Sequence, residues 1–428
     1  MKLNYKRTIL VGFAFFIISA FWQAYDKTIP MLMTYKFGMS QTESGIIMAL
    51  DNVLAVFMLP LFGGLSDRVK TKYGKRTVFI FFGTICSVIA FLMIPLIGSL
   101  WLFITVLLVT LISMATFRSP AVALMPDVTI KPLRSKGNAI INLMGTAGGL
   151  LVLALGMVIT VGKDHMDNFM PYYIGVCGIM LAGLIVFLLT VKENLWASEM
   201  EAESLRLGID ETPDKSVDEN VGKKLPRDQL ISLLLILASV ALWYMGYNAI
   251  TSKYSLYADS VLKQSYDLTL LIAQAGAIIA YIPVGILASK FGRKKTILAG
   301  VAMLATAFFI AIFMTENSSP VFMYIIFAFA GIAWATINVN SFPMVVELAK
   351  SGDTGKYTGW YYAASMSAQV LTPILSGAIM DIAGNMSPLF PYASICVACA
   401  FVTMFFVKHG DSKPEAKGAL ESLAGEDD

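Results

Sequence analysis

The chain consists largely of long apolar segments separated by short runs of charged and turn-forming residues. A helix needs about 20 apolar residues to cross the roughly 30 Å hydrocarbon core of a bilayer. Hydrophobic residues make up 57% of the 428 residues and charged residues only 14%, whereas soluble domains carry about 25% charged residues. These values exclude an unusually apolar soluble protein. The apolar segments are approximately 8–34, 43–66, 76–97, 100–126, 137–161, 170–191, 229–252, 267–289, 295–315, 320–347, 357–380 and 388–407.

The segments predict an all-α integral membrane protein with twelve transmembrane helices. The first segment starts at Thr8 and exceeds the roughly 7–15 apolar residues of a signal-peptide core. We therefore expect it to remain in the membrane as a signal anchor.

Lysine and arginine placement predicts the orientation, because positively charged residues concentrate in cytoplasmic loops. With the N-terminus inside, the basic clusters at 68–76, 131–136 and 290–295 all face the cytoplasm. We therefore expect both termini in the cytoplasm. A chain without large extramembrane domains suits the inner membrane of a bacterium. The basic residues left outside or at outer helix ends are Lys27, Lys36, Lys163, Lys253 and Lys263.

The longest polar stretch lies near the middle of the chain and suggests two similar halves. We expect a short amphipathic helix at its start, over Leu195–Leu207, and a polar, disordered C-terminal tail. The predicted parts are an N-terminal six-helix bundle at 1–191, a cytoplasmic linker at 192–228, a C-terminal six-helix bundle at 229–407 and a cytoplasmic tail at 408–428.

Matching residues recur in the two halves. Arg118 and Asp127 are separated by the same interval as Asn338 and Glu347. Internal duplication is common in transporters, so these matches predict two pseudo-symmetric six-helix bundles.

A loop motif recurs as well. "GGLSDRVKTKYGKR" at 63–76 has a shorter counterpart, "GILASKFGRKK", at 285–295, where Ser289 replaces Asp67. The six-plus-six plan and the pattern G-x-L-x-D-R followed by G-[KR]-R resemble the major facilitator superfamily. The longer loop, "ALDNVLAVFMLPLFGGLSDR" and "FRSPAVALMPDVT" resemble its glycoside-pentoside-hexuronide and sucrose-transporter-like branch.

The resemblance implies that the motif residues control gating. The motif aspartate, Asp67, would face the start of helix 11 near Lys356–Thr358 and hold the two halves together. For the basic residues, simple positive-inside topology is the alternative. Asp127 and Glu347 lie beside basic loops, which favours a structural latch. The predicted gating residues are Asp67, Arg68, Gly74, Arg76, Asp127, Arg134 and Glu347.

Three charged residues fall well inside predicted helices: Asp26, Asp51 and Arg118. A charge at a helix centre costs about 2.5–3.5 kcal/mol on insertion scales, so such residues mark functional sites. We expect Arg118 to face an aqueous cavity, where it pairs with Asp26 or Asp51 or binds substrate hydroxyls. A static structural ion pair is the alternative.

Amides and aromatic rings in the spans extend this predicted site. Sugars bind to amides through their hydroxyl groups and to aromatic faces through their C–H surfaces. For each aromatic residue, helix packing or interface anchoring is the alternative. The candidates are Asn52, Asn142, Asn248, Gln274, Asn338, Gln369, Trp22, Tyr25, Trp243 and Tyr247, with Tyr244, Trp334, Trp360 and Tyr361 as further aromatic faces.

The cysteines and histidines do not indicate a catalytic or metal site. All four cysteines lie in apolar segments, and His165 and His409 lie in loops or tails. We therefore expect no enzyme activity, no metal and no cofactor beyond a coupling proton or sodium ion. The expected partners are a small-molecule substrate and the bilayer, without nucleic acid, and the expected state is a monomer.

The leading hypothesis is a secondary transporter of a small polar solute, a sugar or glycoside, driven by proton symport. Asp26 or Asp51 would take the proton, and Arg118 would couple it to the substrate. Sodium coupling and efflux of drugs or metabolites are alternatives within the same fold. A membrane hydrolase lacks a recognisable nucleophile and base, a channel would need oligomeric rings, and a receptor would need a larger signalling domain.

Overall fold

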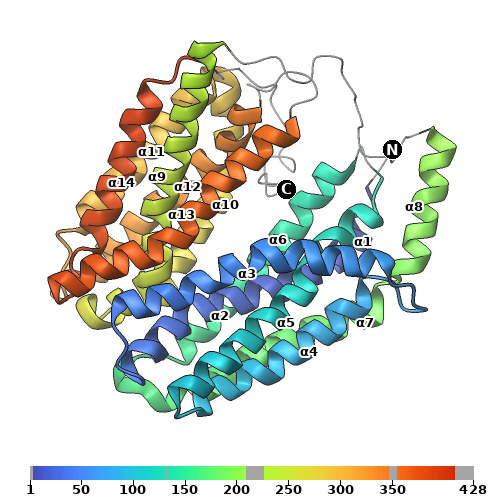
Figure 1. Ribbon diagram of the computed structural model, residues 1–428, viewed down its shortest axis with the longest axis horizontal. Coiled ribbons are helices and arrows are strands. Elements are labelled where there is room, and N and C mark those ends of the chain that lie inside the picture. Colours follow the sequence, from blue (N-terminus) through green and yellow to red (C-terminus); the bar gives the residue numbers. More distant parts are fainter. Residues whose placement is uncertain (1–2, 131–132, 209–225, 347–353, 410–428) are drawn as a thin grey trace. The chain divides into compact units, whose positions relative to one another are not determined.

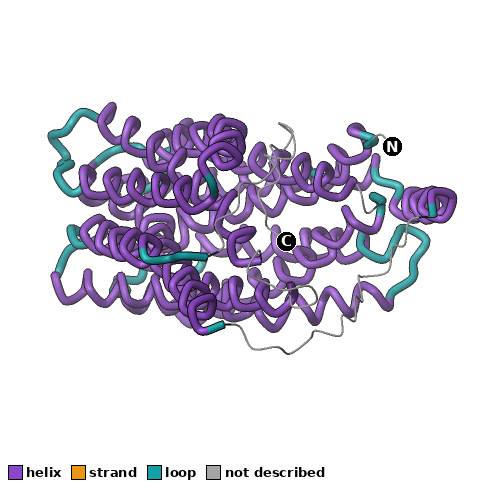
Figure 2. The backbone as a smooth tube through the Cα atoms, turned by 90° about the horizontal axis from the view of Figure 1, so that it is seen from above, coloured by secondary structure: helices purple, strands orange, loops and turns teal. Residues whose placement is uncertain are grey.

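The computed structural model describes residues 3–130, 133–208, 226–346 and 354–409. In these ranges the chain forms helices, turns and loops, with no strand (Figure 2). The predicted all-α class is confirmed.

The chain divides into two compact units. The first comprises Met1–Phe37 and Leu50–Pro213, and the second comprises Gly38–Ala49 and Asp214–Asp428. The first turns of the second predicted helix therefore belong to the second unit, although the rest of that helix belongs to the first.

The first unit contains the helices drawn from blue to green in Figure 1. They are α1 (Tyr5–Val11), α2 (Phe13–Tyr35), α3 (Gln41–Arg68) from Leu50 onward, α4 (Thr77–Met93), η1 (Ile94–Leu96), α5 (Leu100–Asp127), α6 (Arg134–Val158), η3 (Lys163–Asn168), α7 (Phe169–Thr190) and α8 (Glu193–Leu207).

The second unit contains the start of α3 and the helices drawn from yellow-green to red. They are α9 (Arg227–Tyr257), the π-helical turn η4 (Ala258–Leu262), α10 (Tyr266–Phe291), α11 (Arg293–Ala311), α12 (Pro320–Val346), α13 (Thr354–Ala383) and α14 (Leu389–Phe405).

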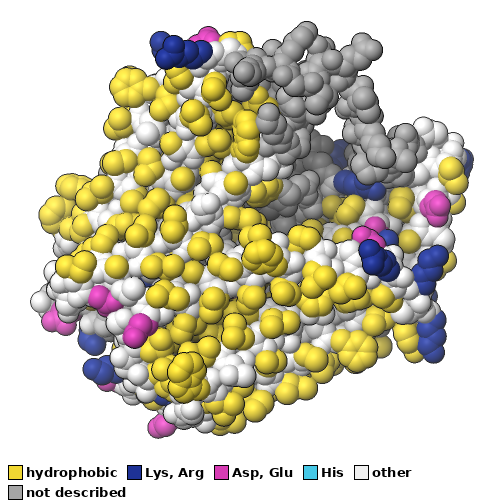
Figure 3. All heavy atoms as spheres, viewed as in Figure 1, with side chains coloured by type: hydrophobic (Ala, Val, Ile, Leu, Met, Phe, Trp, Pro, Cys, Tyr) yellow, Lys and Arg dark blue, Asp and Glu magenta, His cyan; other side chains and the backbone are white. Residues whose placement is uncertain are grey.

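The helices account for all twelve predicted spans. Ten are long and apolar enough to cross a membrane, and two shorter apolar helices, Tyr266–Tyr281 and Leu389–Phe405, complete the set in the described residues. On the face shown in Figure 3, hydrophobic side chains cover the helix lengths, and charged side chains gather near the helix ends. This distribution suits helices surrounded by lipid.

One helix, α8, lies outside the twelve spans. It covers Glu193–Leu207, close to the predicted amphipathic segment, and ends at Gly208 with a left-handed backbone (φ 65°). Glu193 lies in its first turn and Arg206 in its last turn, which complements the helix dipole. The remaining predicted linker residues, 209–225, lie outside the described residues, as does the tail from 410 onward.

Candidate functional site

The loop motif between α3 and α4 is organised around the buried side chain of Arg76. Its Nε donates to Asp127 Oδ2 at 2.8 Å, and its terminal nitrogens contact Asp67 and the hydroxyl of Ser66. Lys75 Nζ lies 3.1 Å from the same Asp127 oxygen. Asp127, at the end of α5, thus joins that helix to the α3–α4 loop.

A carboxylate from α8 caps α4 within this network. Glu193, 2% exposed, accepts hydrogen bonds from the backbone N–H of Arg76 (2.9 Å) and from the backbone N–H (2.8 Å) and hydroxyl (2.7 Å) of Thr77. A carboxylate at a helix N-terminus adds about 0.3–1 kcal/mol, and up to about 2 kcal/mol when partly buried. Glu193 is therefore a structural residue, and its position in a charged linker did not predict this role.

Gly74 is required by both its backbone and its surroundings. Its φ is 120°, and a Cβ at this position would lie 2.1 Å from Glu193 Oε2. Only glycine adopts this conformation without strain and leaves room for the capping carboxylate.

Replacement of Arg76 with alanine should destabilise the first unit. Two carboxylates would lose their shared cation, which costs about 3–5 kcal/mol for a fully buried pair. We expect about 2–3 kcal/mol, because Asp67 is 59% exposed and therefore partly screened. Thermal unfolding of the purified protein measures this loss. The exposed Arg68, changed to alanine, is the control, and an equal melting temperature for R76A and R68A would contradict the assignment.

The other predicted gating residues occupy separate positions. Arg134 donates to the carbonyls of Pro126 (3.0 Å) and Thr129 (3.2 Å), so it caps the C-terminal end of α5. Arg68 is exposed at the end of α3. Glu347 lies outside the described residues.

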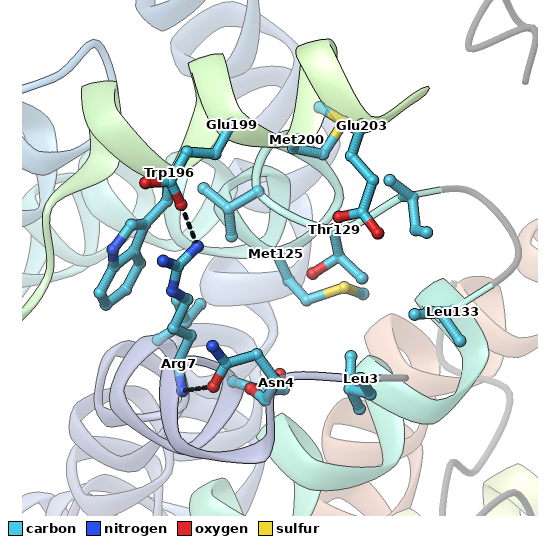
Figure 4. Close-up of a pocket in the computed structure, with 14 residues that line it drawn as sticks. Leu3, Asn4, Arg7, Met125, Thr129, Leu133, Trp196, Glu199, Met200 and Glu203 are labelled. Atoms are coloured by element: carbon cyan, nitrogen blue, oxygen red, sulfur yellow. Dashed lines mark hydrogen bonds and ion pairs between the residues drawn. The ribbon is translucent and has the colours of Figure 1, made fainter. Parts of the chain in front are cut away.

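One face of α8, formed by Trp196, Glu199, Met200 and Glu203, borders a small cavity in the first unit (Figure 4). Arg7 from α1 forms an ion pair with Glu199 (2.5 Å), and its guanidinium lies 5.3 Å from the ring centre of Trp196. The cavity, about 120 Å³, is well below the roughly 300 Å³ at which small-molecule pockets begin. We therefore assign these contacts to the docking of α8 against α1 and α5.

Lys36, beyond the end of α2, is held against η1. Its Nζ donates to the carbonyl of Pro95 at 2.6 Å and lies 5.9 Å from the ring centre of Phe37. Burial lowers the pKa of this ammonium group below its usual value. The contact fixes the end of α2 and indicates a structural role.

The charged residues predicted inside the membrane form one cluster in the first unit. Asp26 is on α2, Asp51 on α3 and Arg118 on α5, and all three are half-buried. Asp51 interacts electrostatically with both Asp26 and Arg118. Asp51 Oδ1 also accepts from the backbone N–H (2.6 Å) and side-chain amide (2.9 Å) of Asn52. Three helices thus converge on two carboxylates and one guanidinium.

Two predicted aromatic residues border this cluster. The Arg118 guanidinium lies 5.7 Å from the ring centre of Trp22, within the range of a cation–π interaction. Trp22 and Tyr25 meet edge to face at 5.2 Å. The buried Trp22 Nε1 and the Tyr25 hydroxyl have no hydrogen-bond partner among the described residues. The cluster therefore combines charges, an aromatic face and two available donors.

The second unit contains an aromatic group on α9 and α12. Tyr247 stacks on Trp334 with ring centres 3.6 Å apart and planes 6° apart. Tyr244 meets the same indole edge to face at 5.2 Å. Tyr247 was predicted as a site residue, and Trp334 and Tyr244 as further aromatic faces.

Trp243 and Asn248 are placed differently from that aromatic group. Trp243 is fully buried and lies one helical turn from Gly246, where a Cβ would meet Val397 of α14 at 2.5 Å. This position fits helix packing better than contact with a substrate. The buried Asn248 amide nitrogen has no hydrogen-bond partner among the described residues, and its backbone carbonyl accepts from Ser252 at 2.7 Å.

The remaining predicted amides lie on four different helices, and all are half-buried. The backbone carbonyl of Asn338 accepts from Ser341 at 3.2 Å, and that of Asn142 from Thr146 at 3.1 Å. These residues are Asn142 on α6, Gln274 on α10, Asn338 on α12 and Gln369 on α13.

A polar contact at the start of α3 was not predicted. The Asp381 carboxylate on α13 accepts from the backbone N–H groups of Gln41 (2.8 Å) and Thr42 (2.7 Å) and from the Thr42 hydroxyl (2.5 Å). The buried Lys253 on α9 donates to the Gln41 carbonyl at 2.8 Å and interacts electrostatically with Asp381. A residue of α13 thus caps the N-terminus of α3 within the second unit.

Close backbone packing reinforces this cap. A Cβ on Gly45 would lie 2.0 Å from the carbonyl oxygen of Pro373, and one on Gly377 would lie 2.2 Å from that of Gln41. Two glycines therefore let α3 and α13 approach until their backbones touch.

The architecture and the cluster inside the membrane define an integral membrane transport protein. The sequence profile of the Major Facilitator Superfamily matches residues 11–274 and 244–424, and the chain belongs to this superfamily. As expected, it is a transporter and not an enzyme, and its class implies a small-molecule substrate. An uncharacterized MFS-type transporter from Methanocaldococcus jannaschii is 24% identical over 410 residues, covering 94% of this chain and 95% of the relative.

Solved structures share the fold at low sequence identity. The inward-open xylose transporter XylE from E. coli superposes with a TM-score of 0.67 and 15% identity, covering 98% of this chain and 99% of XylE. A peptide transporter POT in complex with sulfate superposes with a TM-score of 0.68 and 13% identity, covering 94% of this chain and 93% of that transporter. The nucleoside transporter NupG superposes with a TM-score of 0.65 and 13% identity, covering 93% of this chain and 99% of NupG.

Proposed function

We propose that the protein is a proton-coupled symporter of a small polar solute, a sugar or glycoside. The first unit and the second unit would rock about a central site in alternating access. The observation that carries this proposal is the cluster of Asp26, Asp51 and Arg118 inside the membrane-spanning part of the first unit.

The cluster suits proton coupling because its charges do not balance. Asp51 interacts with one cation, Arg118, and with a second carboxylate, Asp26. Two carboxylates in a poorly solvated site repel each other, and a proton bound to either one relieves the repulsion. Substrate that contacts Arg118 would change this balance, which is how the two ligands would be coupled.

A polar, hydroxyl-rich substrate suits the groups beside the cluster. Arg118 offers donors in a fixed planar geometry, Asn52 offers an amide, and Trp22 offers an aromatic face. The motif resemblance to the sugar-transporting branch supports this choice. The structural neighbours do not select it, because proteins described as xylose, nucleoside and peptide transporters share the fold equally well.

Uptake into proteoliposomes tests the proposal. The purified protein is offered a panel of radiolabelled sugars and glycosides under an inward proton gradient, an inward sodium gradient or neither. We expect at least one sugar to accumulate under the proton gradient alone. Accumulation under the sodium gradient alone would show that sodium, not the proton, is the coupling ion. Absence of sugar uptake under every gradient would contradict the sugar assignment.

Replacement of Asp51 with asparagine should separate coupling from substrate movement. The variant keeps the shape of the side chain but cannot exchange a proton. We therefore expect gradient-driven accumulation to be lost, while exchange of internal for external solute continues within about threefold of wild type, the cost of less than 1 kcal/mol. Asp26→Asn identifies which carboxylate carries the proton. Accumulation by both variants at the wild-type level would contradict the assigned role of the pair.

A further inference from the structure

A groove runs along the second unit between α10 and α11. One wall consists of Ile279, Pro283 and Leu287 of α10, the other of Ala299 and Met303 of α11, and its volume is about 520 Å³. Ile332 and Thr336 of α12 form its floor. We refer to it as the α10–α11 groove.

The walls and floor of the groove are apolar. Ile279 is 73% exposed and Leu287 45% exposed. The two lining hydroxyls are already used, because Thr336 donates to the Ile332 carbonyl (2.7 Å) and Thr296 to the Gly292 carbonyl (2.8 Å). The groove therefore suits a hydrocarbon chain, because neither hydroxyl has a proton left to donate to a polar solute.

One end of the groove carries positive charge. Lys295, in the first turn of α11, is exposed and lines the groove, and Lys290 is exposed near the end of α10. Lys294 is turned away from them, since its Nζ donates to the carbonyls of Phe405 (3.0 Å) and Val407 (2.5 Å). Lys295 thus places an exposed ammonium group at the groove. The Lys290 ammonium lies 5.5 Å from the ring centre of Phe291, which also lines the groove.

This charge has no acidic neighbour in sequence. Between Asp267 and Glu316 the chain contains no aspartate or glutamate. The corresponding loop of the first unit is different, because Arg76 contacts Asp67 and Asp127. Ser289 occupies the position of Asp67 in the second copy, so this loop lacks the counterpart of one of the two carboxylates. The counterpart of Asp127, Glu347, lies outside the described residues.

We propose that the α10–α11 groove binds an anionic phospholipid. One acyl chain lies along Ile279, Leu287 and Met303, and the phosphate lies between Lys290 and Lys295. A cationic pocket at the end of an apolar channel selects a lipid with net negative charge over a zwitterionic one. This site is distinct from the cluster at Asp26, Asp51 and Arg118 and does not depend on what that cluster transports.

Native mass spectrometry of the detergent-solubilised protein tests the selectivity. Phosphatidylglycerol and phosphatidylcholine with identical acyl chains are titrated separately. Each lysine near the phosphate should contribute roughly fivefold in affinity, so Lys290→Gln with Lys295→Gln should weaken phosphatidylglycerol binding by roughly 25-fold. The matched control changes Lys70 and Lys72, exposed in the α3–α4 loop, to glutamine and should leave affinity unchanged. Equal affinity for the two lipids, or an equal loss in the control, would overturn the proposal.

Photo-cross-linking locates the acyl chain without any substitution. Wild-type protein is illuminated with phosphatidylglycerol carrying a diazirine near the end of one chain, and the adducts are mapped by peptide mass spectrometry. We expect adducts within 279–287 and 299–303, reduced at least tenfold by excess unlabelled phosphatidylglycerol but not by glycerol phosphate, which lacks the chains. Adducts confined to other helices would refute the site, and competition by glycerol phosphate would show a headgroup site without the groove.

Discussion

Gradient-driven uptake is expected to fall roughly 100-fold when Arg118 is replaced with glutamine. The substitution removes the cation that interacts with Asp51 and lies over Trp22. Removing one partner of a fully buried charge pair costs about 3–5 kcal/mol. Arg118 and Asp51 are half-buried, so we take the low end, about 3 kcal/mol, as the loss in the transport step, which corresponds to roughly 100-fold. The measurement is the initial uptake rate of the sugar identified in proteoliposomes.

A double substitution distinguishes charge balance from loss of a substrate contact. Arg118→Gln combined with Asp51→Asn removes both members of the pair, so exchange should recover at least tenfold relative to R118Q, as expected for interacting residues. Accumulation should stay absent. Arg206→Gln, at the exposed end of α8, is the control for loss of one arginine. Wild-type uptake by R118Q would exclude Arg118 from the site, and no recovery in the double variant would assign it to substrate binding alone.

Backbone amides at the start of α3 are expected to exchange roughly tenfold faster when Asp381 is replaced with alanine. The carboxylate accepts from two N–H groups of the first turn, and hydrogen bonds to a charged group contribute about 1.5–3 kcal/mol. We take the low end because Asp381 is exposed to solvent. Hydrogen exchange followed by mass spectrometry on peptides covering residues 38–49 measures the change.

The cap lies within the second unit, to which α3 belongs up to Ala49. The effect of D381A should therefore be confined to the start of α3. The control is Glu316→Gln in the exposed α11–α12 loop. Unchanged exchange over 38–49 in D381A would show that the cap adds no local stability.

The helices were predictable because the bilayer imposes a length. Even the short apolar helix α14 has enough apolar residues to be recognised, and turn residues mark its ends. The charged cluster was predictable for the same reason, because Asp26, Asp51 and Arg118 stand out in a chain this apolar. Each charge costs a few kcal/mol to place in the membrane, so such residues indicate a functional site. The structure shows that the three residues interact. From the sequence, this interaction was one of several possible arrangements.

Long-range pairings were not predictable. Glu193 follows the sixth span as one acidic residue in a charged linker, and nothing adjacent to it indicates that it caps α4. Asp381 and Lys253 lie at the ends of the eleventh and seventh spans, and opposite charges at helix ends were the only available signal. Trp243 is the opposite case: the sequence suggested a substrate contact, but the buried position of this residue fits helix packing better. A single sequence does not reveal which face of α9 packs against α14.

The docking of α8 changes where the chain can be divided. A cut placed directly after the sixth span would separate Glu193 from α4 and leave the first-turn amides of that helix without their acceptor. A cut between Gly208 and Pro226 keeps α8 with the helices that it supports. Co-expression of two fragments should therefore assemble a working transporter from the second division and fail from the first, which gives a practical boundary for labelling or exchanging the halves.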